Sequence, residues 1–426
     1  MPASLRDTRL ANAAWLTAPE TQQVFDVLEQ AGCTVRAVGG TVRNTLLGEP
    51  VSDIDLATDA LPDKVMIAAA DAGLKVVPTG IEHGTVTIVV AGIPFEVTTL
   101  RRDVSTDGRR ATVAYTNDWA QDAERRDFTI NAIYCDREGR LLDPVGGLDD
   151  IAIRRVRFIG DARQRIREDY LRILRFFRFC AQYAGGKLDP GGLAACQEER
   201  AGLARLSAER IHHEFMRLLE APAAVATLRT MHKHGFLRDI LEMDGNVDAL
   251  AKLEAITGVN SQNIEPTRID RLLRFAVLAV TNNDDVMRIV KRLRMSNAEA
   301  KRLEVAMSAL SQIERMAFEA SELSLKAAVY RFGNKAVFDA VAILWSRGHA
   351  PIDSSDFRRM AELAVTLEPP SLPFSGRDII GRGVPAGPRV SAILKAFEQW
   401  WVSAGFPEDR PQLDRKLDAL ITVTKS

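Results

Sequence analysis

The stretch Ala37–Val65, AVGGTVRNTLLGEPVSDIDLATDALPDKV, decides the fold of the first part of the chain. A strand pattern ends at Gly39 and Gly40, and a helical pattern begins at once. Because glycine has no side chain, backbone N–H groups of this turn can approach a phosphate, and the helix N-terminus adds positive potential. Arg43, one turn into the helix, can add charge. A Gly-Gly pair alone is also typical of an ordinary turn, so both interpretations stay open.

The second half of this stretch carries two carboxylates. In Ser52-Asp53-Ile54-Asp55-Leu56, the strand period of two places Asp53 and Asp55 on one face and turns Ile54 and Leu56 toward the core. Like charges this close repel unless a cation lies between them, and oxygen ligands suit Mg²⁺. A solvated acidic loop is the alternative. The phosphate-binding turn just upstream favours the metal site.

A third carboxylate, Glu96, lies in a later strand pattern, Pro94–Thr98. Three acidic groups on adjacent strands can hold two metal ions ~3.5–4 Å apart, as in phosphoryl transfer. An exposed strand glutamate without a function is an equally open interpretation.

Length and composition describe a folded protein of several domains. The 426 residues correspond to roughly three domains at about 150 residues each. With 46% hydrophobic and 27% charged residues, the chain can bury a core and differs from disordered proteins. Because the net charge is −1, a nucleic-acid partner would have to be held by a local basic patch.

Two periodicities divide the chain. Short β-rich runs, separated by Gly, Pro and Asp, come first. These runs are Thr34–Val38, Val51–Leu56, Thr85–Val90 and Pro94–Thr98. Beyond about Asp161, apolar residues recur three and four apart, as in long helices. The sequence therefore predicts an α/β head with a mixed sheet, followed by a large all-α part.

The cysteines and the hydropathy indicate a soluble protein of the reducing cytoplasm. Cys33, Cys135, Cys180 and Cys196 form no C-x-x-C pair, which argues against a zinc site or a disulfide framework. Met1–Thr17 lacks the apolar core of a signal peptide, and no window approaches the ~20 apolar residues of a membrane span.

Two segments predict connections. The polar, Arg- and Asp-rich segment Arg101–Arg126 is predicted to be a mobile loop. The segment Leu367–Ser375 has three prolines in nine residues, so we expect a linker with a small tail module after it.

The segment Glu168–Tyr183 predicts a helix with a buried apolar stripe. Asp169 and Arg172, at i and i+3, lie side by side on another face, where a surface salt bridge is the simplest interpretation. The surrounding stretch has nine arginines against three acidic residues, which favours contact with phosphates or, alternatively, a solvated helix face. These arginines are Arg154, Arg155, Arg157, Arg163, Arg165, Arg167, Arg172, Arg175 and Arg178.

Five motifs, in order along Ala31–Leu219, resemble those of class II tRNA nucleotidyltransferases, a family that comprises the CCA-adding enzymes and the bacterial poly(A) polymerases. The motifs are Gly39-Gly40-x-x-Arg43, Ser52-Asp53-Ile54-Asp55, Arg125-Arg126-Asp127-Phe128-Thr129-Ile130-Asn131-Ala132, Asp143-Pro144-x-Gly146-Gly147 and Glu168-Asp169-x-x-Arg172-x-x-Arg175.

The resemblance implies roles for these residues. Asp53 and Asp55 would bind catalytic Mg²⁺. Glu96 stays the third catalytic candidate on the strand pattern given above. Asp127, with Arg126, would contact the ribose. The residues implied around the nucleotide are Gly39, Gly40, Arg43, Arg126, Asp127, Asn131, Asp169, Arg172 and Arg175. The segment from Ser207 to Arg210 would begin a helix that braces the nucleotide-binding helix.

The resemblance also gives Asp169 and Arg172 a function whose logic follows from base chemistry. Cytosine and adenine both present an amino donor beside a ring-nitrogen acceptor, which a carboxylate beside a guanidinium complements. Guanine and uracil present a carbonyl beside an N–H, and buried polar groups would then stay unpaired. A protein helix would thus select C and A without a nucleic-acid template.

The resemblance implies a polymerase-beta-like nucleotidyltransferase head over residues 1–150, a helical neck over 151–222, a body over 223–368 and an RNA-binding tail over 369–426. The implied activity is transfer of C and A from CTP and ATP to the 3′ end of tRNA, with no membrane and no obligate protein partner. Poly(A) polymerase activity, CC-only or A-only addition, and a non-catalytic RNA-binding protein are the alternatives. Gly80–Arg102 resembles the CCA-adding side of the family, and both acidic residues of the Asp53–Asp55 pair are present.

Overall fold

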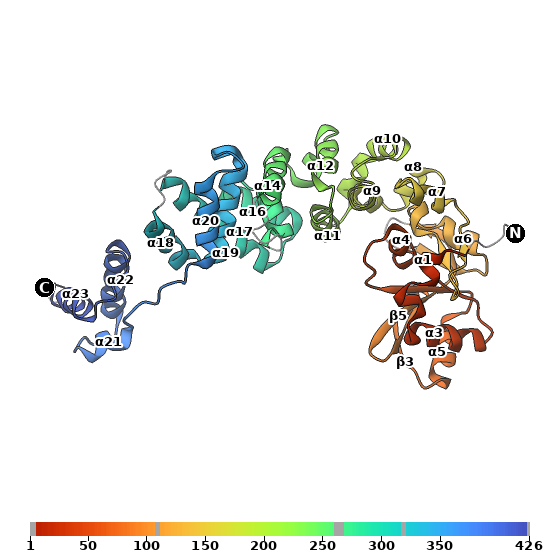
Figure 1. The fold of residues 1–426 in the computed structure, drawn as a ribbon, viewed down its shortest axis with the longest axis horizontal. Helices are drawn as coiled ribbons and strands as arrows, with labels where there is room; N and C mark the ends of the chain where they lie inside the picture. The colour runs from red at the N-terminus through yellow and green to blue at the C-terminus, as the bar shows by residue number, and fades with distance from the viewer. Residues whose placement is uncertain (1–5, 107–110, 260–267, 317–320, 424–426) are drawn as a thin grey trace. The chain divides into compact units, whose positions relative to one another are not determined.

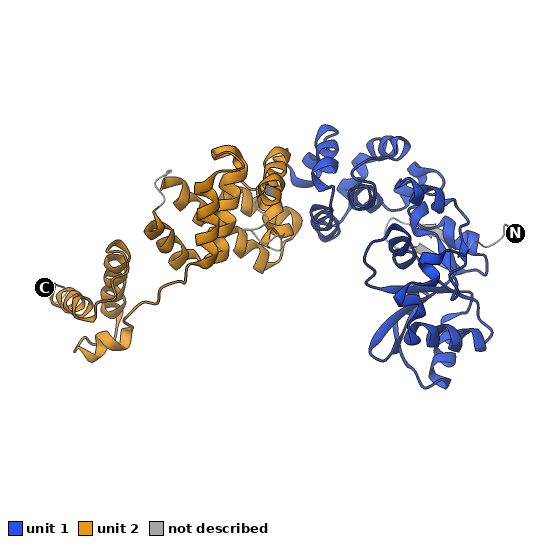
Figure 2. Cartoon of the chain, in the orientation of Figure 1, with its two compact units in different colours: residues 1–245 blue, residues 246–426 orange. Residues whose placement is uncertain are grey.

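The computed structural model describes residues 6–106, 111–259, 268–316 and 321–423. The chain divides into two compact units, residues 1–245 and residues 246–426 (Figure 2). The four parts with boundaries at 150, 222 and 368 stay predictions, because the two units are defined by compactness alone. Within the described residues, every helix is too short or too polar to cross a bilayer.

A seven-stranded mixed sheet forms the centre of the head (Figure 1). The strand order is β3-β4-β5-β2-β1-β8-β9, with β2 and β5 parallel and the other neighbours antiparallel. The strands are β1 (Val35–Val38), β2 (Ile54–Thr58), β3 (Lys75–Gly80), β4 (Thr85–Val90), β5 (Ile93–Thr99), β8 (Tyr134–Cys135) and β9 (Leu141–Leu142). The predicted mixed sheet is confirmed.

Helices cover both faces of this sheet. Helices α3 (Pro19–Gln30) and α5 (Pro62–Asp71) lie on one face and α4 (Gly40–Leu47) on the other (Figure 1). Proline at the first position starts α3 and α5, where its missing N–H costs no hydrogen bond. The layers bury apolar side chains such as Val24 and Leu46.

The prediction of a mobile loop over Arg101–Arg126 is wrong for the described residues, which contain two strands and a helix. Strands β6 (Arg101–Thr106) and β7 (Ala111–Tyr115) form an antiparallel ribbon, and α6 (Trp119–Glu124) follows. Residues 107–110 lie outside the described residues. Backbone pairing between the two strands satisfies the N–H and C=O groups, and the polar composition of the segment gives no sign of that pairing.

From Gly147 onward, the named elements in the described part of unit 1 are helices, as predicted. They are α7 (Gly147–Ala152), α8 (Ala162–Glu168), α9 (Leu171–Tyr183), α10 (Pro190–Glu198), α11 (Ala208–Leu219), α12 (Ala224–Lys233) and α13 (Phe236–Leu241). The short helices α1 (Thr8–Ala11) and α2 (Ala14–Thr17) precede the sheet.

A cluster of aromatic rings holds α9 against the head. Phe128 lies 5.0 Å from Phe158 and 5.0 Å from Phe179, measured between ring centres, and Phe158 lies 5.3 Å from Phe176. Phe128 and Phe176 are fully buried. Such aromatic pairs add about 0.5–1.5 kcal/mol each beyond area burial, so the cluster fixes the residues next to Phe128 relative to α9.

The named elements of unit 2 within its described residues are helices. Its helices are α14 (Val247–Val259), α15 (Arg271–Ala279), α16 (Asn283–Leu293), α17 (Asn297–Arg315), α18 (Glu322–Phe332), α19 (Asn334–Leu344), α20 (Ser355–Thr366), α21 (Gly376–Gly381), α22 (Pro388–Ser403) and α23 (Arg410–Val423). The segment Leu367–Ser375 contains neither helix nor strand, as the proline content predicts. A separate apolar cluster that includes Phe397 and Trp401 follows it.

Candidate active site

The turn between β1 and α4 brings a guanidinium and a carboxylate together over Gly39. Gly39 has φ 74° and ψ −126°, a conformation that favours glycine. A Cβ atom at this position would lie 3.7 Å from Arg126 Nη1 and 4.0 Å from Asp55 Oδ2. Helix α4 begins at Gly40, so its unpaired N–H groups point to the same place.

Three carboxylates lie on or just before two parallel strands, β2 and β5. Asp55 on β2 is in register with Glu96 on β5, and Asp53 comes just before β2. The predicted strand Val51–Leu56 is therefore wrong at its start. Thr41 Oγ1 donates to the carbonyl oxygen of Asp53 at 2.6 Å, so this oxygen bonds to α4 and not to a neighbouring strand.

The electrostatics of these carboxylates favour a cation. Burial raises the pKa of Asp55, and the charge of Glu96 raises it further, whereas Arg126 lowers it. Asp53 and Glu96 are exposed. Among the described residues, no three His, Cys, Asp or Glu side chains form a ready metal cluster. The fit to a divalent ion therefore rests on the oxygen donors and on the repulsion that such an ion would relieve.

Asp127 is the centre of a buried hydrogen-bond network. Its Oδ1 accepts from Phe128 N and from Asn131 Nδ2, each at 2.9 Å, and its Oδ2 accepts from Arg175 Nε at 2.8 Å and from Nη2. Burial alone would raise the pKa of Asp127, but the charge of Arg175 and the Asn131 hydrogen bond outweigh burial and lower it far below its ordinary value. Asp127 is therefore ionised at neutral pH.

Arg43 is buried behind the glycine turn and bonds to neutral groups. Its Nη2 donates to Tyr183 Oη at 2.7 Å and to Asn44 Oδ1 at 2.8 Å, and its Nη1 donates to Asn131. The guanidinium carbon lies 4.2 Å from the centre of the Tyr183 ring. Burial lowers the pKa of Arg43. A cation buried among neutral partners at a glycine turn suits an anionic ligand.

The predicted helix Glu168–Tyr183 is present as α9, but it begins three residues later, at Leu171. Helix α8 ends at Glu168, Asp169 is its C-cap, and α9 starts two residues later. Asp169 Oδ2 accepts from Arg210 Nη2 at 2.7 Å, and Arg172 Nη1 donates to Glu168 Oε2 at 2.6 Å. The simple salt bridge between Asp169 and Arg172 is therefore wrong, because each side chain is held by a third residue.

One cavity of about 440 Å³ brings most of the predicted residues together. Its lining consists of Gly39, Gly40, Arg43, Asp55, Arg126, Asp127, Asn131, Asp169, Leu171, Arg172, Arg175, Phe179 and Arg210. The predicted Asp53 and Glu96 do not line it, and both are exposed. Among the lining arginines, Arg126, Arg172, Arg175 and Arg210 each have a carboxylate partner. Arg43 bonds to neutral groups, so its charge is the one that suits an anionic ligand.

Several residues at this cavity were missed by sequence reasoning. Phe179 lines it, Tyr183 bonds to Arg43, and Glu214 on α11 accepts from Arg178 Nε at 2.6 Å. Residues 175, 179 and 183 are four apart, so they share one face of α9. This spacing could have placed Phe179 and Tyr183 beside Arg175, whereas nothing local indicates Glu214.

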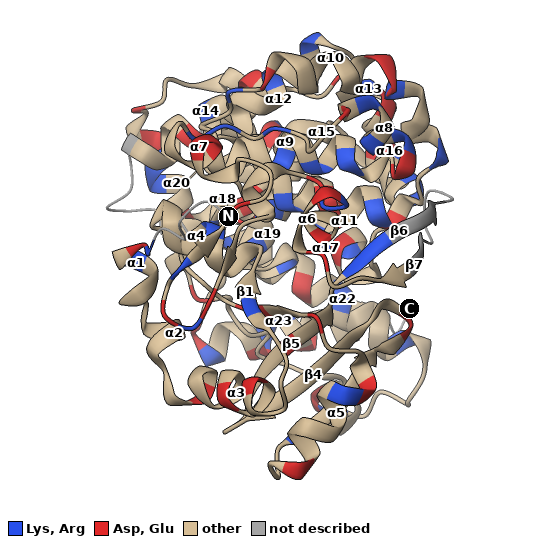
Figure 3. Ribbon diagram, turned by 90° about the vertical axis from the view of Figure 1, so that its right-hand side faces the viewer, with Lys and Arg blue, Asp and Glu red and all other residues tan. Residues whose placement is uncertain are grey.

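The arginine-rich stretch is largely neutralised by carboxylates from elsewhere in the chain. Arg155 and Arg157 share the buried Asp150, at 2.5 and 2.9 Å. All nine arginines have an acidic partner; Figure 3 colours basic residues blue and acidic residues red along the ribbon. The excess charge predicted from the sequence window disappears because most of these partners lie outside the window.

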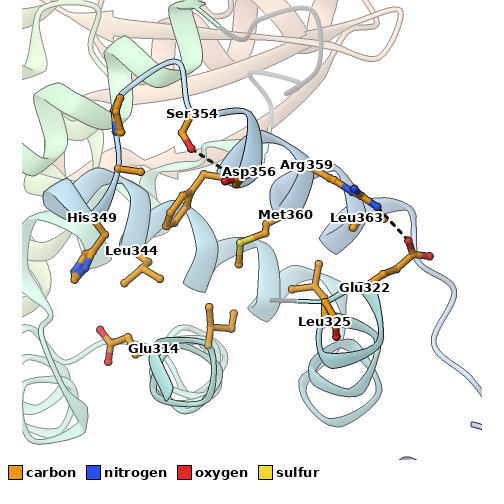
Figure 4. A pocket seen from close by; sticks show the side chains of 15 residues that line it. Glu314, Glu322, Leu325, Leu344, His349, Ser354, Asp356, Arg359, Met360 and Leu363 are labelled. Carbon is orange, nitrogen blue, oxygen red and sulfur yellow. Dashed lines mark hydrogen bonds and ion pairs between the residues drawn. The ribbon is translucent and has the colours of Figure 1, made fainter. Parts of the chain in front are cut away.

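A larger cavity of about 770 Å³ lies in unit 2 (Figure 4). Its floor includes Leu325, Leu344 and Met360, and Arg359 forms an ion pair with Glu322 at 3.6 Å on one side. None of the predicted site residues lines it. It is a second concave region, and its lining also includes Glu314, His349 and Asp356.

Three family models match the chain. They are the poly A polymerase head domain at residues 35–157, a probable RNA- and SrmB-binding site of polymerase A at residues 187–243, and a putative tRNA nucleotidyltransferase domain 2 at residues 268–413.

Curated relatives match along most of their length. The mitochondrial CCA tRNA nucleotidyltransferase 1 of Mus musculus is 33% identical over 409 residues, which are 93% of this chain and 91% of the relative. The CCA-adding enzyme of Geobacillus sp. (strain WCH70) is 33% identical over 382 residues, 88% of this chain and 90% of the relative.

Solved structures agree in fold. The crystal structure of the Bacillus stearothermophilus CCA-adding enzyme in complex with CTP has a TM-score of 0.74 and 28% identity, and it covers 96% of this chain and 100% of that one. The Thermotoga maritima CCA-adding enzyme complexed with tRNA has a TM-score of 0.67 and 17% identity, over 98% of this chain and 99% of that one.

Proposed function

The chain belongs to the family of CCA-adding tRNA nucleotidyltransferases, and we propose that it adds C and A nucleotides from CTP and ATP to the 3′ end of tRNA without a template. The observation that carries the proposal is the single head cavity, which joins the glycine turn, an acidic strand and the Asp169–Arg172 segment. The glycine turn can bind a triphosphate, the carboxylate of the acidic strand can bind a metal ion, and the Asp169–Arg172 segment can hydrogen-bond to a nucleobase.

Asp53 and Asp55, with Glu96 beside them, are proposed to hold Mg²⁺. When bound, the ion would help to ionise the attacking hydroxyl and would neutralise charge on the phosphate and on the leaving oxygen. Burial first, and the charge of Glu96 next, raise the pKa of Asp55, and a cation bound beside it would oppose both effects, which supports this assignment.

The remaining residues are proposed to bind and orient the nucleotide. The resemblance assigns Arg126 to the ribose, but its Nη1 lies 3.7 Å from the position that a Cβ atom at Gly39 would take, so we place it with Gly39, Gly40 and Arg43 around the triphosphate. The ionised Asp127 would accept hydrogen bonds from the ribose. Arg175 and Asn131 would keep Asp127 in place, since both donate to it.

Asp169 and Arg172 are proposed to recognise the base. Their existing partners, Arg210 and Glu168, leave each side chain fixed at the cavity wall. A fixed carboxylate and a fixed guanidinium would accept cytosine or adenine and would leave unpaired groups against guanine or uracil. The cytoplasm is the proposed compartment.

The deciding experiment incubates the protein with tRNA that lacks its 3′ CCA end, Mg²⁺ and labelled CTP and ATP. Addition of three nucleotides is the expected result. Long adenylate tails would identify a poly(A) polymerase, two cytidines or one adenosine would identify a specialised enzyme, and the absence of incorporation would refute the proposal. Replacing CTP and ATP by GTP and UTP is the matched control and should give no product.

A further inference from the structure

Tyr134 lies at the start of a hydrogen-bond chain that reaches the glycine turn. It is fully buried on β8, and its hydroxyl donates to Asp122 Oδ2 at 2.8 Å. The same oxygen accepts from Arg126 Nη2 at 3.1 Å and from Arg126 Nε at 3.3 Å. The third nitrogen of this guanidinium, Nη1, lies 3.7 Å from the position that a Cβ atom at Gly39 would take. Two nitrogens are thus anchored, and the third is directed to the turn.

Asp122, the carboxylate in this chain of hydrogen bonds, is ionised at neutral pH. Burial alone would raise the pKa of Asp122, but Arg126 and Arg125 outweigh burial and lower it to about 2. The Asp122 side chain is 1% exposed. A carboxylate this deeply buried needs all its acceptor positions filled, and the Tyr134 hydroxyl fills one of them without adding charge.

The Asp122 carboxylate also binds the first residue of the β6–β7 ribbon. Asp122 Oδ1 accepts from the backbone N–H of Arg101 at 3.3 Å and from Arg125 Nε at 2.8 Å. The Asp122 side chain therefore needs an orientation in which Oδ1 accepts from the ribbon and Oδ2 accepts from Arg126. The Tyr134 hydroxyl, on β8 of the head sheet, is the neutral group that fixes this orientation.

We propose that Tyr134 is a positioning residue for the nucleotide triphosphate: by holding Oδ2 of Asp122, it directs Nη1 of Arg126 at phosphates bound over Gly39 and Gly40. The inference rests on the proposed function. It predicts an effect that is the same for CTP and ATP, because the chain of contacts includes none of the residues proposed to recognise the base.

The test compares Tyr134→Phe with the wild-type protein. Loss of one hydrogen bond to a charged group should raise the KM for CTP and for ATP by the same factor, about 3- to 10-fold. The Kd for cytidine, which has no phosphates, should not change. The matched control is Tyr330→Phe, which removes a hydrogen bond of the same kind in unit 2, from Tyr330 Oη to Glu398 Oε1 at 2.8 Å, and should leave both KM values unchanged.

A double-mutant cycle separates positioning from general loosening. In an Arg126→Ala background, Tyr134→Phe should raise KM no further. Trp119→Phe trims a side chain that packs edge-on against Tyr134, with ring centres 5.1 Å apart, and should lower thermal stability without changing KM. If Tyr134→Phe does not fold, Asp122→Asn breaks the same chain and should raise the same KM values.

Three results would overturn the inference: unchanged KM values in every folded variant of the chain, a full effect of Tyr134→Phe in the Arg126→Ala background, or a weakened Kd for cytidine. A wild-type protein that adds no nucleotide would refute the proposed function instead, so the two failures can be told apart.

Discussion

Replacing Asp55 by Asn should make the protein inactive without making it less stable. Asp55 is in register with Glu96 and close to Asp53, and its pKa is raised by burial first and by these charges next. A raised pKa means that the folded protein holds this proton more tightly than the unfolded chain does. The charged carboxylate therefore lowers the free energy of unfolding as pH rises through its folded pKa, and Asn removes this penalty.

The activity of Asp55→Asn should fall by about 10²–10³-fold, or about 2.7–4 kcal/mol, the scale for loss of one central electrostatic group at an active site. Opposite changes in activity and stability are typical of a functional carboxylate, whereas a structural carboxylate loses both together.

The assay combines single-turnover nucleotide incorporation with thermal unfolding, with and without Mg²⁺. The wild-type protein should gain thermal stability from Mg²⁺, and Asp55→Asn should gain much less. The matched control is Asp59→Asn near the other end of β2, where Oδ1 accepts from Thr34 N at 2.8 Å and an amide oxygen can replace it. Near-normal activity of Asp55→Asn at saturating Mg²⁺, or a clear loss of stability without metal, would refute this reasoning.

Three further predictions follow from the ion pairs of the site. Arg210→Ala removes the partner of Asp169, so we expect increased misincorporation of G and U with a stability change within about 1 kcal/mol; unchanged selectivity in a four-nucleotide competition assay would contradict this. Glu214→Ala leaves Arg178 buried without its carboxylate, and urea denaturation should show a loss of about 3–5 kcal/mol; a loss below about 1 kcal/mol would mean that the pair is solvated. The pKa of Asp122 is lowered from 3.8 to about 2 in the folded protein. Its ionised carboxylate therefore stabilises the fold at pH values above 3.8, and this contribution to the free energy of unfolding is lost as the pH falls from 3.8 to about 2. Unfolding temperatures below about pH 4 should therefore fall more steeply in the wild-type protein than in Asp122→Asn, and equal slopes would argue against the shift.

The sequence predicted what depends on neighbours along the chain. The glycine turn between β1 and α4, the strand with Asp55 and the long helices follow from backbone sterics and side-chain periodicity, which act over a few residues. The same reasoning was wrong at the β6–β7 ribbon, because its pairing satisfies backbone groups irrespective of side-chain polarity.

The arrangement of the site was decided by contacts between distant residues. Tyr183 lies 140 positions from Arg43, and Arg175 lies 48 positions from Asp127, yet each pair is joined by hydrogen bonds. The sequence alone determined which charged groups are present and on which elements they lie. Only the tertiary structure decided which of them meet, because aromatic packing around Phe128 and the register of β2 with β5 set these distances, and neither leaves a local pattern.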